Sequence, residues 1–247
     1  MRLSTIPVLV LIVILSSGVL LSPVSGDTGS DRFASGDYAG AITEYEQELP
    51  GLSETLKAPV LNNIGTCYVS LDQPEKAVEY YNRAVNADPS YGRGWINLGV
   101  VHERLGSQSE ALICYNKVSG DPALLAEAAV KKGTLLAGQK KLDEALAAFQ
   151  SAEPGASGQV AIDMYTGIGG IEFMKNDIAA AEMAFLNAID IDPSGAAMAY
   201  TNLGVIRIAQ NRYTDAKSAF ESAIQNDPHG KTKSAQYLSK LEAMGVV

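Results

Sequence analysis

The side chains best suited to catalysis or metal binding in this 247-residue chain are two histidines and two cysteines. His102 and His229 lie far apart in the sequence, and no histidine or cysteine cluster has the spacing of a metal site. His102 stands where the preceding repeat has the aromatic residue Tyr68, so we expect it to pack as a core residue, and His229 follows Pro228 in a predicted turn. The sequence therefore predicts a protein that is not an enzyme and that holds no cofactor and no metal.

Three glycine-containing stretches could be mistaken for phosphate-binding loops. They are Gly92-Arg93-Gly94, residues 155–158 and residues 167–170. None of them follows a predicted strand, and residues 167–170 lie inside a predicted helix whose backbone amides are already hydrogen-bonded. We therefore expect no nucleotide site.

The two cysteines lie in neighbouring parts of the chain. Cys67 and Cys114 are each surrounded by apolar residues, and an unpaired cysteine commonly packs as a small hydrophobic side chain. A disulfide would be possible in an exported protein if the two residues came close enough. The sequence favours two buried free thiols over this bridge.

The elements that position these residues are helices that recur along the chain. Ala77 and Tyr81 are four residues apart, which places them on one face of a helix. Asp88-Pro89 then ends this helix, because the residue before a proline is disfavoured in the α conformation. The same arrangement begins again thirty-four residues after Ala77, at Ala111. A repeat of this length predicts one elongated array of helical hairpins.

The repeat can be followed through six units of about 34 to 36 residues. In the second helix of each unit, small and aromatic residues recur as Ala41 and Tyr45; Ala77, Tyr81 and Ala84; Ala111 and Tyr115; Ala145, Phe149 and Ala152; Ala181, Phe185 and Ala188; and Ala216, Phe220 and Ala223. A glycine inside a helix costs about 1 kcal/mol relative to alanine, so its recurrence requires a close contact between the paired helices. The first helices carry this glycine as Gly65, Gly99, Gly133, Gly169 and Gly204.

These spacings and residue types resemble the tetratricopeptide repeat over nearly all of residues 31–228. The resemblance is carried by two runs: Trp95, Leu98, Gly99, Ala111 and Tyr115, and Tyr200, Leu203, Gly204, Ala216, Phe220, Ala223 and Pro228. It implies an all-α, right-handed superhelical solenoid of helix-turn-helix repeats, with about five full repeats and a truncated first one. The units fall near residues 31–56, 57–90, 91–123, 124–158, 159–194 and 195–228.

The sequence departs from the regular repeat at both ends and in the middle. Only Asp31–Ala34 remains for the first helix of the first unit, and Lys132 replaces a packing leucine, which predicts that the fourth unit is the least stable. We also expect a hinge at residues 153–159. Residues 230–243 predict a C-terminal capping helix. Its Tyr237, Leu238 and Leu241 would face inward, and its Lys233, Ser234 and Glu242 would face outward.

The resemblance implies that the first helices line a concave groove that holds an extended peptide or a helix of a partner protein. Asparagine and arginine suit such a groove because they can hydrogen-bond a peptide backbone or acidic side chains. A carboxylate-binding clamp known in some members is incomplete here, because Asn62, Thr66 and Glu127 replace three of its side chains. The predicted groove residues are Asn62, Asn63, Thr66, Arg93, Asn97, Val100, Arg104, Lys131, Thr134, Thr166, Phe173 and Asn202.

Charge gives a further expectation about partners. The formal net charge of −9 disfavours binding to nucleic acid phosphates. Basic residues nevertheless concentrate in the third and fourth units, which predicts an acidic segment in the partner protein. These residues are Arg93, Arg104, Lys131, Lys132, Lys140 and Lys141.

Residues 1–26 have the pattern of a secretory signal peptide. Arg2 precedes an apolar run, and small residues lead to Gly26, after which cleavage is expected. An uncleaved membrane anchor is the alternative, although the apolar run is short for a spanning helix. The prediction is thus an exported or membrane-tethered scaffold for protein partners, in contact with a membrane only through this segment. Alternatives are a cell-envelope assembly or organising factor and a receptor for a small ligand or glycan.

Overall fold

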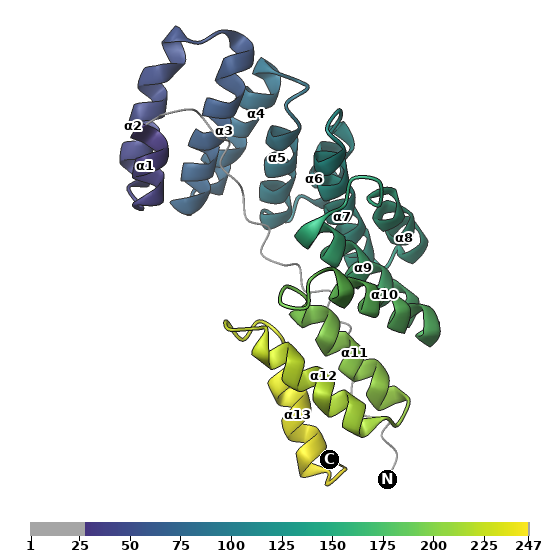
Figure 1. Ribbon diagram of the computed structural model, residues 1–247. Coiled ribbons are helices and arrows are strands. Elements are labelled where there is room, and N and C mark those ends of the chain that lie inside the picture. Colours follow the sequence, from purple (N-terminus) through teal and green to yellow (C-terminus); the bar gives the residue numbers. More distant parts are fainter. Residues whose placement is uncertain (1–27, 247) are drawn as a thin grey trace. The chain divides into compact units, whose positions relative to one another are not determined.

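The computed structural model describes residues 28–246, and these residues form thirteen α-helices, one short 3-10 helix and no strand (Figure 1). This confirms the predicted all-α repeat fold. The predicted signal peptide or anchor at residues 1–26 lies outside the described residues. The helices are α1 (Thr28–Ala34), α2 (Tyr38–Glu48), η1 (Leu49–Gly51), α3 (Glu54–Ser70), α4 (Pro74–Ala87), α5 (Gly92–Arg104), α6 (Gln108–Lys117), α7 (Pro122–Gly138), α8 (Leu142–Ser151), α9 (Gly158–Met174), α10 (Ile178–Ile191), α11 (Ala197–Ala209), α12 (Tyr213–Gln225) and α13 (Ser234–Ala243).

The described residues fall into two compact units. The N-terminal unit ends at Ala128, and the C-terminal unit begins at Ala129, so that α7 contributes residues to both. Within the N-terminal unit α1 pairs with α2, α3 with α4, and α5 with α6. Within the C-terminal unit α9 pairs with α10, α11 with α12, and α12 with α13. Helices that follow one another in sequence therefore make the most extensive contacts.

Each hairpin turns at a residue in the left-handed conformation. Asp72, Lys140, Asn176 and Asn211 adopt positive φ angles between 57° and 65° at this place, which favours glycine, asparagine or aspartate. Gly36 and Gly106 fill the same place in the remaining hairpins. The turn therefore needs a residue that tolerates this conformation, which explains why glycine or a polar residue stands there. In each hairpin the second helix begins two residues after this position.

The recurring glycines allow the two helices of a hairpin to approach closely. A Cβ atom placed on Gly65 would lie 2.6 Å from Cε1 of Tyr81, and real Cβ atoms do not come that close to a neighbour. In all six hairpins, the glycine of the first helix lies against the aromatic ring sixteen residues later. The pairs are Gly29–Tyr45, Gly65–Tyr81, Gly99–Tyr115, Gly133–Phe149, Gly169–Phe185 and Gly204–Phe220.

Gly29 is a member of this series that the sequence reasoning missed. The first helix of the first unit was expected to keep only Asp31–Ala34, but α1 begins at Thr28 and includes the glycine that packs against Tyr45. The first hairpin is therefore built with the same glycine–aromatic contact as the others.

The hydroxyl groups of the buried tyrosines each have a partner. Tyr45 Oη lies 3.2 Å from Ser30 Oγ, and Tyr81 Oη lies 3.1 Å from Thr66 Oγ1. Tyr115 donates a hydrogen bond to Glu103. The other three hairpins carry phenylalanine at this place and have no hydroxyl to satisfy. Tyrosine therefore occurs where a polar partner is in reach, as buried polar groups require.

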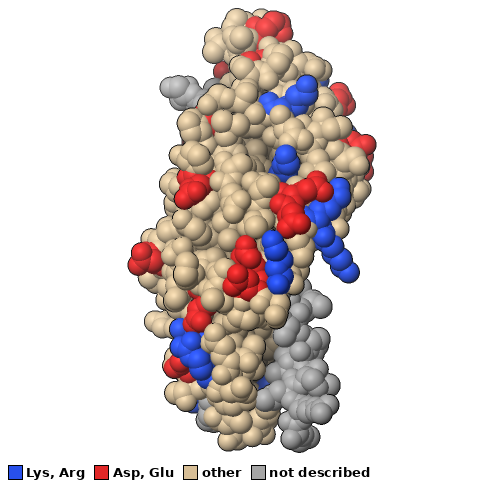
Figure 2. All heavy atoms as spheres, turned by 90° about the vertical axis from the view of Figure 1, so that its right-hand side faces the viewer, with Lys and Arg blue, Asp and Glu red and all other residues tan. Residues whose placement is uncertain are grey.

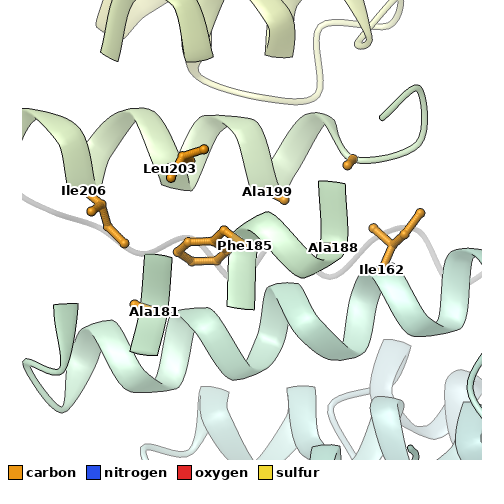
Figure 3. Packing of buried hydrophobic residues seen from close by; sticks show 8 residues of the cluster. Ile162, Ala181, Phe185, Ala188, Ala199, Leu203 and Ile206 are labelled. Carbon is orange, nitrogen blue, oxygen red and sulfur yellow. The ribbon is translucent and has the colours of Figure 1, made fainter. Parts of the chain in front are cut away.

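The packing between successive hairpins is clearest in the C-terminal unit. Phe185 of α10 lies among apolar side chains of α9, α10 and α11, and its ring fills the space between these helices (Figure 3). The ring is only 1% exposed. The cluster consists of Ile162, Ala181, Phe185, Ala188, Ala196, Ala199, Leu203 and Ile206.

The last helix covers the end of the C-terminal unit. Leu241 of α13 is buried, and the ring of Tyr237 stacks on Phe220 with 5.4 Å between ring centroids. One expectation about this helix was wrong, because Ser234 does not face outward. Its side chain is fully buried and lies 2.7 Å from Thr201 Oγ1. A hydroxyl at the start of α13 thus meets a hydroxyl of α11, which fixes the helix on the stack.

Both cysteines are buried free thiols, as the sequence favoured. Burial raises the pKa of Cys67 to about 12 and that of Cys114 to about 11. Both therefore stay protonated and pack as small apolar groups.

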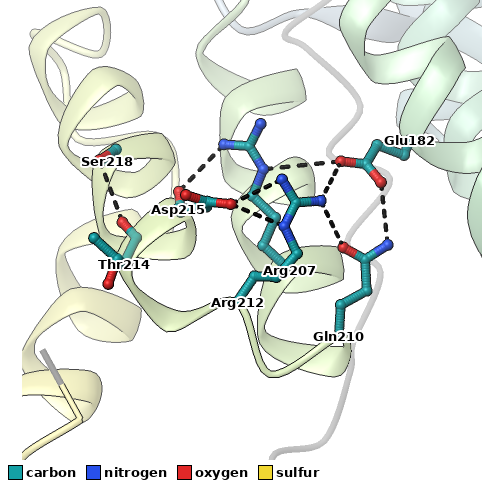
Figure 4. A network of polar contacts seen from close by, with 7 residues as sticks. All are labelled: Glu182, Arg207, Gln210, Arg212, Thr214, Asp215 and Ser218. Carbon is teal, nitrogen blue, oxygen red and sulfur yellow. Dashed lines mark hydrogen bonds and ion pairs between the residues drawn. The ribbon is translucent and has the colours of Figure 1, made fainter.

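A polar network joins α10 to the α11–α12 hairpin (Figure 4). Glu182 of α10 accepts hydrogen bonds from Arg212 at 3.0 Å and from Gln210 at 3.1 Å, and it lies 3.9 Å from Nε of Arg207. Arg207 also donates a hydrogen bond to the backbone oxygen of Asp215 at 3.2 Å. Since the Glu182 and Arg207 side chains are only 20% and 19% exposed, this network is shielded from solvent more than an ordinary surface ion pair.

Replacing Glu182 with alanine is expected to lower the free energy of unfolding by about 1–3 kcal/mol, because Arg207 is left without its carboxylate in a half-buried place. Denaturant unfolding measures this change. The matched control is Glu221→Ala on α12, which removes an exposed glutamate and should change stability by less than about 0.5 kcal/mol. Equal effects of the two substitutions would show that the network does not stabilise the fold.

Candidate functional site: the first-helix faces

The predicted groove residues all lie on the first helices of their hairpins. We call the surface formed by α3 and α5 the first-helix face of the N-terminal unit, and the surface formed by residues 129–138 of α7 with α9 and α11 that of the C-terminal unit. Asn62, Asn63 and Thr66 lie on α3; Arg93, Asn97, Val100 and Arg104 on α5; Lys131 and Thr134 on α7; Thr166 and Phe173 on α9; and Asn202 on α11.

The asparagines of the N-terminal unit lie inside the stack of helices. Asn62, Asn63, Thr66 and Asn97 are at most 2% exposed, and Val100 is also buried. Asn97 Nδ2 donates a hydrogen bond of 2.8 Å to Asn62 Oδ1, which links α5 to α3. Hydrogen bonds between buried amides hold neighbouring hairpins in register. These side chains therefore have a structural role that the sequence reasoning did not assign to them.

The two arginines of the predicted groove are already paired within the chain. Arg93 Nη1 lies 2.7 Å from Glu127 Oε2, and these side chains are 20% and 18% exposed. Arg104 forms an ion pair with Asp72 at the turn of the preceding hairpin. An acidic partner would have to compete with Glu127 and Asp72 for these guanidinium groups.

The lysines of the predicted basic region differ in their surroundings. Lys131 and Lys132 are half-buried on α7, whereas Lys140 and Lys141 are exposed at the turn that follows it. On the face drawn in Figure 2, basic and acidic side chains of the described residues lie side by side, without a broad patch of either sign. The acidic segment in the partner stays a prediction.

Asp163 is a residue of the C-terminal face that the sequence reasoning missed. It stands on α9 at the place that Arg93 and Glu127 hold on α5 and α7, so the repeat spacing could have identified it. Its Oδ1 accepts a hydrogen bond of 2.8 Å from Gln159. Burial raises the pKa of Asp163 from its ordinary value of 3.8 to about 6, although Gln159 and the charge of Lys131 oppose this shift.

One turn further along α9, Thr166 has a hydroxyl oxygen that is buried and has no hydrogen-bond partner among residues 28–246. A buried polar atom of this kind costs free energy until a partner is supplied. Residues three apart on a helix share one side, so Asp163 and Thr166 lie together on the first-helix face of the C-terminal unit.

The raised pKa of Asp163 predicts a pH dependence of stability. The folded protein holds this proton to about pH 6, whereas the unfolded chain releases it near pH 3.8. The favourable contribution is therefore complete below the unfolded value and is lost as the pH rises through about 6. The loss is at most about 3 kcal/mol, and solvent screening reduces it.

Denaturant unfolding at pH 4, 5, 6 and 7 measures this effect as the difference between the wild type and Asp163→Asn. The wild type should lose stability relative to this variant as the pH rises. Asp190→Asn on α10, which alters an exposed carboxyl, is the matched control and should follow the wild type. A constant difference between wild type and Asp163→Asn across this range would contradict the prediction.

The remaining predicted groove residues have different surroundings. Thr134 is half-buried, and its hydroxyl donates a hydrogen bond to the backbone oxygen of Val130 at 2.9 Å. Asn202 is half-buried on α11. Phe173 packs against the apolar cluster around Phe185, so most of its ring serves the core. The half-buried polar residues of this face are thus Lys131, Thr134, Asp163, Thr166 and Asn202.

The described residues also bear on metal binding and on membrane crossing. Among residues 28–246, no group of three or more His, Cys, Asp or Glu side chains is placed to hold a metal ion. No helix in the same range is long and apolar enough to cross a membrane. His102 is half-buried, and burial lowers its pKa while Glu110 opposes this change.

Comparison with known proteins identifies two segments of the chain. Residues 58–91 and residues 175–231 each match a family model of the tetratricopeptide repeat. Among curated relatives, a photosystem I assembly protein Ycf3 from Synechococcus sp. (strain CC9311) is 32% identical over 76 residues, which is 30% of this chain and 44% of that protein. The heat shock protein STI1 from Saccharomyces cerevisiae is 33% identical over 89 residues, which is 36% of this chain and 15% of that protein. The chain thus spans less than half the length of these relatives.

A solved structure shows the same fold over most of the chain. The C-terminal part of a TPR repeat-containing protein from Cytophaga hutchinsonii superimposes with a TM-score of 0.61 and 15% identity, and covers 88% of this chain and 87% of that one. At this identity the similarity concerns the fold alone. Together with the glycine–aromatic contacts, these matches identify residues 58–91 and 175–231 as tetratricopeptide repeats in a chain whose described residues form an all-α repeat array.

Proposed function

We propose that the protein is a non-catalytic scaffold that binds an extended segment or a helix of a partner protein on its first-helix faces. Tetratricopeptide repeats generally mediate interactions between proteins, and one relative is named as an assembly protein. The scaffold would bring a partner to a site of assembly rather than change it chemically.

The observation that carries this proposal is the polar composition of the C-terminal face. Three successive first helices present five half-buried polar residues there, and the second helices provide the packing behind them. A partner segment that runs across α7, α9 and α11 could contact Lys131, Asp163 and Asn202 in turn. Such repeated contacts along an extended segment are how repeat arrays gain affinity from individually weak interactions.

The N-terminal face contributes differently to this proposal. Its asparagines are buried and hydrogen-bonded between hairpins, so they set the spacing of the helices. Arg104 is the exposed member of its predicted groove residues, and Asp72 holds its side chain in place. We therefore assign most of the binding to the C-terminal face.

The sequence of residues 1–26 supports a proposal about the location of the scaffold. Their pattern supports export, either as a secreted protein or as one tethered by an uncleaved segment, and is compatible with a role as an assembly or organising factor of the cell envelope. N-terminal sequencing of the protein from its own cells tests this point. Asp27 as the first residue supports cleavage, whereas Met1 or Arg2 supports an anchor.

A pair of substitutions within one hairpin tests the binding proposal. Thr134→Arg places a bulky charged side chain on the C-terminal face, and Ala147→Arg places the same side chain on the exposed side of α8. Partner proteins captured with the tagged wild type from its own cells are quantified for each variant. We expect capture to fall about tenfold for Thr134→Arg, which corresponds to 1.4 kcal/mol, and to stay unchanged for Ala147→Arg.

Thermal unfolding of both variants shows whether they remain folded. If Thr134→Arg unfolds, Asn202→Arg on α11 replaces it in the comparison. Capture that survives a folded face variant, or that is lost only in Ala147→Arg, would contradict the proposal.

A further inference from the structure

The balance of charge within the described residues points to the chemistry of the partner. The chain carries a formal net charge of −9. Each arginine among residues 28–246 already contacts a carboxylate or a tyrosine ring of the same chain. These arginines are Arg32, Arg83, Arg93, Arg104, Arg207 and Arg212. The positive groups best suited to bind an acidic segment are therefore engaged, while acidic groups remain in excess.

Asp163 is an acidic group on a first-helix face that the fold compensates only in part. Its carboxylate accepts a hydrogen bond of 2.8 Å from the neutral amide of Gln159. The charge of Lys131 also stabilises the ionised carboxylate, but burial outweighs both effects. Glu127 holds the equivalent place on α7 and has the guanidinium group of Arg93 at 2.7 Å. The fold thus places a guanidinium group directly on Glu127, whereas the group that hydrogen-bonds Asp163 is a neutral amide.

Thr166 adds a hydroxyl oxygen that lacks a hydrogen-bond partner among residues 28–246. Its hydroxyl oxygen is buried and unbonded among the described residues, and it lies one turn from Asp163 on the same helix. A hydroxyl oxygen and a carboxylate can both accept hydrogen bonds from one cationic group. Charge-assisted hydrogen bonds of this kind are about twice as strong as bonds between neutral groups.

We propose that Asp163 and Thr166 form a subsite on the C-terminal first-helix face that takes a lysine or arginine side chain of the partner segment. The cation would donate hydrogen bonds to the carboxylate of Asp163 and to the hydroxyl oxygen of Thr166. This inference rests on the proposed function of that face, and it assigns a basic partner segment in place of the acidic one that the sequence favoured. An acidic segment becomes an outcome of the test.

Binding of defined peptides to the full chain tests the subsite. The probes are two blocked twelve-residue peptides, one with alternating lysine and glycine and the other with alternating glutamate and glycine, each with a fluorescent label. Fluorescence anisotropy at pH 7.5 gives their dissociation constants. We expect the lysine peptide to bind more tightly, Asp163→Asn to weaken it about tenfold, and Thr166→Val to weaken it about threefold.

The matched control is Asp190→Asn, which removes one negative charge from the exposed part of α10 and should change the affinity by less than twofold. Equal weakening by Asp163→Asn and Asp190→Asn would mean that the peptide senses only net charge, and tighter binding of the glutamate peptide would show that the face takes acidic segments. Either result overturns the inference. Thermal unfolding of each variant confirms that it is folded.

The natural partners separate a failure of the subsite from a failure of the scaffold. Capture that is lost in Thr134→Arg and retained in Asp163→Asn leaves the proposed function intact and overturns the subsite. Capture that is retained in Thr134→Arg overturns the proposed function. It also overturns the subsite, because the subsite lies on the same face. Capture that is lost in both folded variants and retained in Asp190→Asn supports both.

Discussion

Replacing Gly169 with alanine is expected to lower the free energy of unfolding by about 2–3 kcal/mol, the usual cost of forcing extra volume into a packed core. The added Cβ atom would lie 2.6 Å from Cε1 and 2.8 Å from Cδ1 and Cζ of Phe185. Because that ring is only 1% exposed, it cannot turn into solvent to make room. Alanine favours the helix by about 1 kcal/mol relative to glycine, which offsets only part of the strain.

Denaturant unfolding with Gly138→Ala as the matched control measures this effect. Gly138 lies at the end of α7 in the same unit, and an added Cβ atom there would have no heavy atom within 4 Å. This control should therefore be neutral or more stable by up to about 1 kcal/mol. A Gly169→Ala protein as stable as the control would show that the glycine is not required for the close approach of α9 and α10.

The second large effect is expected for Phe185→Ala, which should lower the free energy of unfolding by about 3–5 kcal/mol. The ring fills the space between α9, α10 and α11, and its removal leaves a cavity lined by residues such as Ile162 and Leu203 (Figure 3). Leu186→Ala is the matched control, because the next side chain along α10 is 44% exposed and should contribute less than about 1 kcal/mol.

The two substitutions should also interact. Removal of the Phe185 ring opens the space that the methyl group of Gly169→Ala needs, so the double variant should be more stable than the sum of the single effects predicts. A coupling free energy of about 1–2 kcal/mol is expected from the double-mutant cycle. Strict additivity would mean that Gly169→Ala acts on the helix alone and not through its contact with the ring.

The repeat fold could be predicted because one packing rule recurs in every hairpin. Alanine, glycine and an aromatic residue reappear at fixed spacing, and each satisfies the same close contact, as the pair Gly169 and Phe185 illustrates. Gly29 escaped notice because it stands next to the apolar N-terminal segment, where a signal peptide was expected. Ser234 was expected outside because serine is polar, but Thr201 supplies the partner that allows its burial.

The site was harder to predict than the fold. Helical position alone placed Asn62 and Asn97 on a first-helix face, but it could not show that these amides bond to each other and lie inside the stack. The pairing of Arg93 with Glu127 depends on the stagger between hairpins, which no local pattern specifies. Asp163 was passed over because the clustered basic residues directed attention to an acidic partner. The surroundings of each side chain therefore had to come from the structure.

The first helices use their polar side chains differently in the N-terminal and C-terminal units. In the N-terminal unit, polar groups of α3 and α5 are largely used between hairpins, as with Asn62 and Asn97. In the C-terminal unit, Asp163 and Thr166 keep groups that the described fold does not fully satisfy. Incompletely hydrogen-bonded groups lower the stability of the fold, and a partner that hydrogen-bonds them gains this free energy on binding.

Site-specific photo-crosslinking tests the central claim that a partner binds the first-helix faces most directly. A photoreactive phenylalanine derivative is placed at Thr134 on α7 or at Ala147 on α8, and the protein is irradiated in its own cells. The account predicts that partner proteins crosslink from position 134 and not from position 147. Crosslinks of equal strength from both positions, or from position 147 alone, would contradict it.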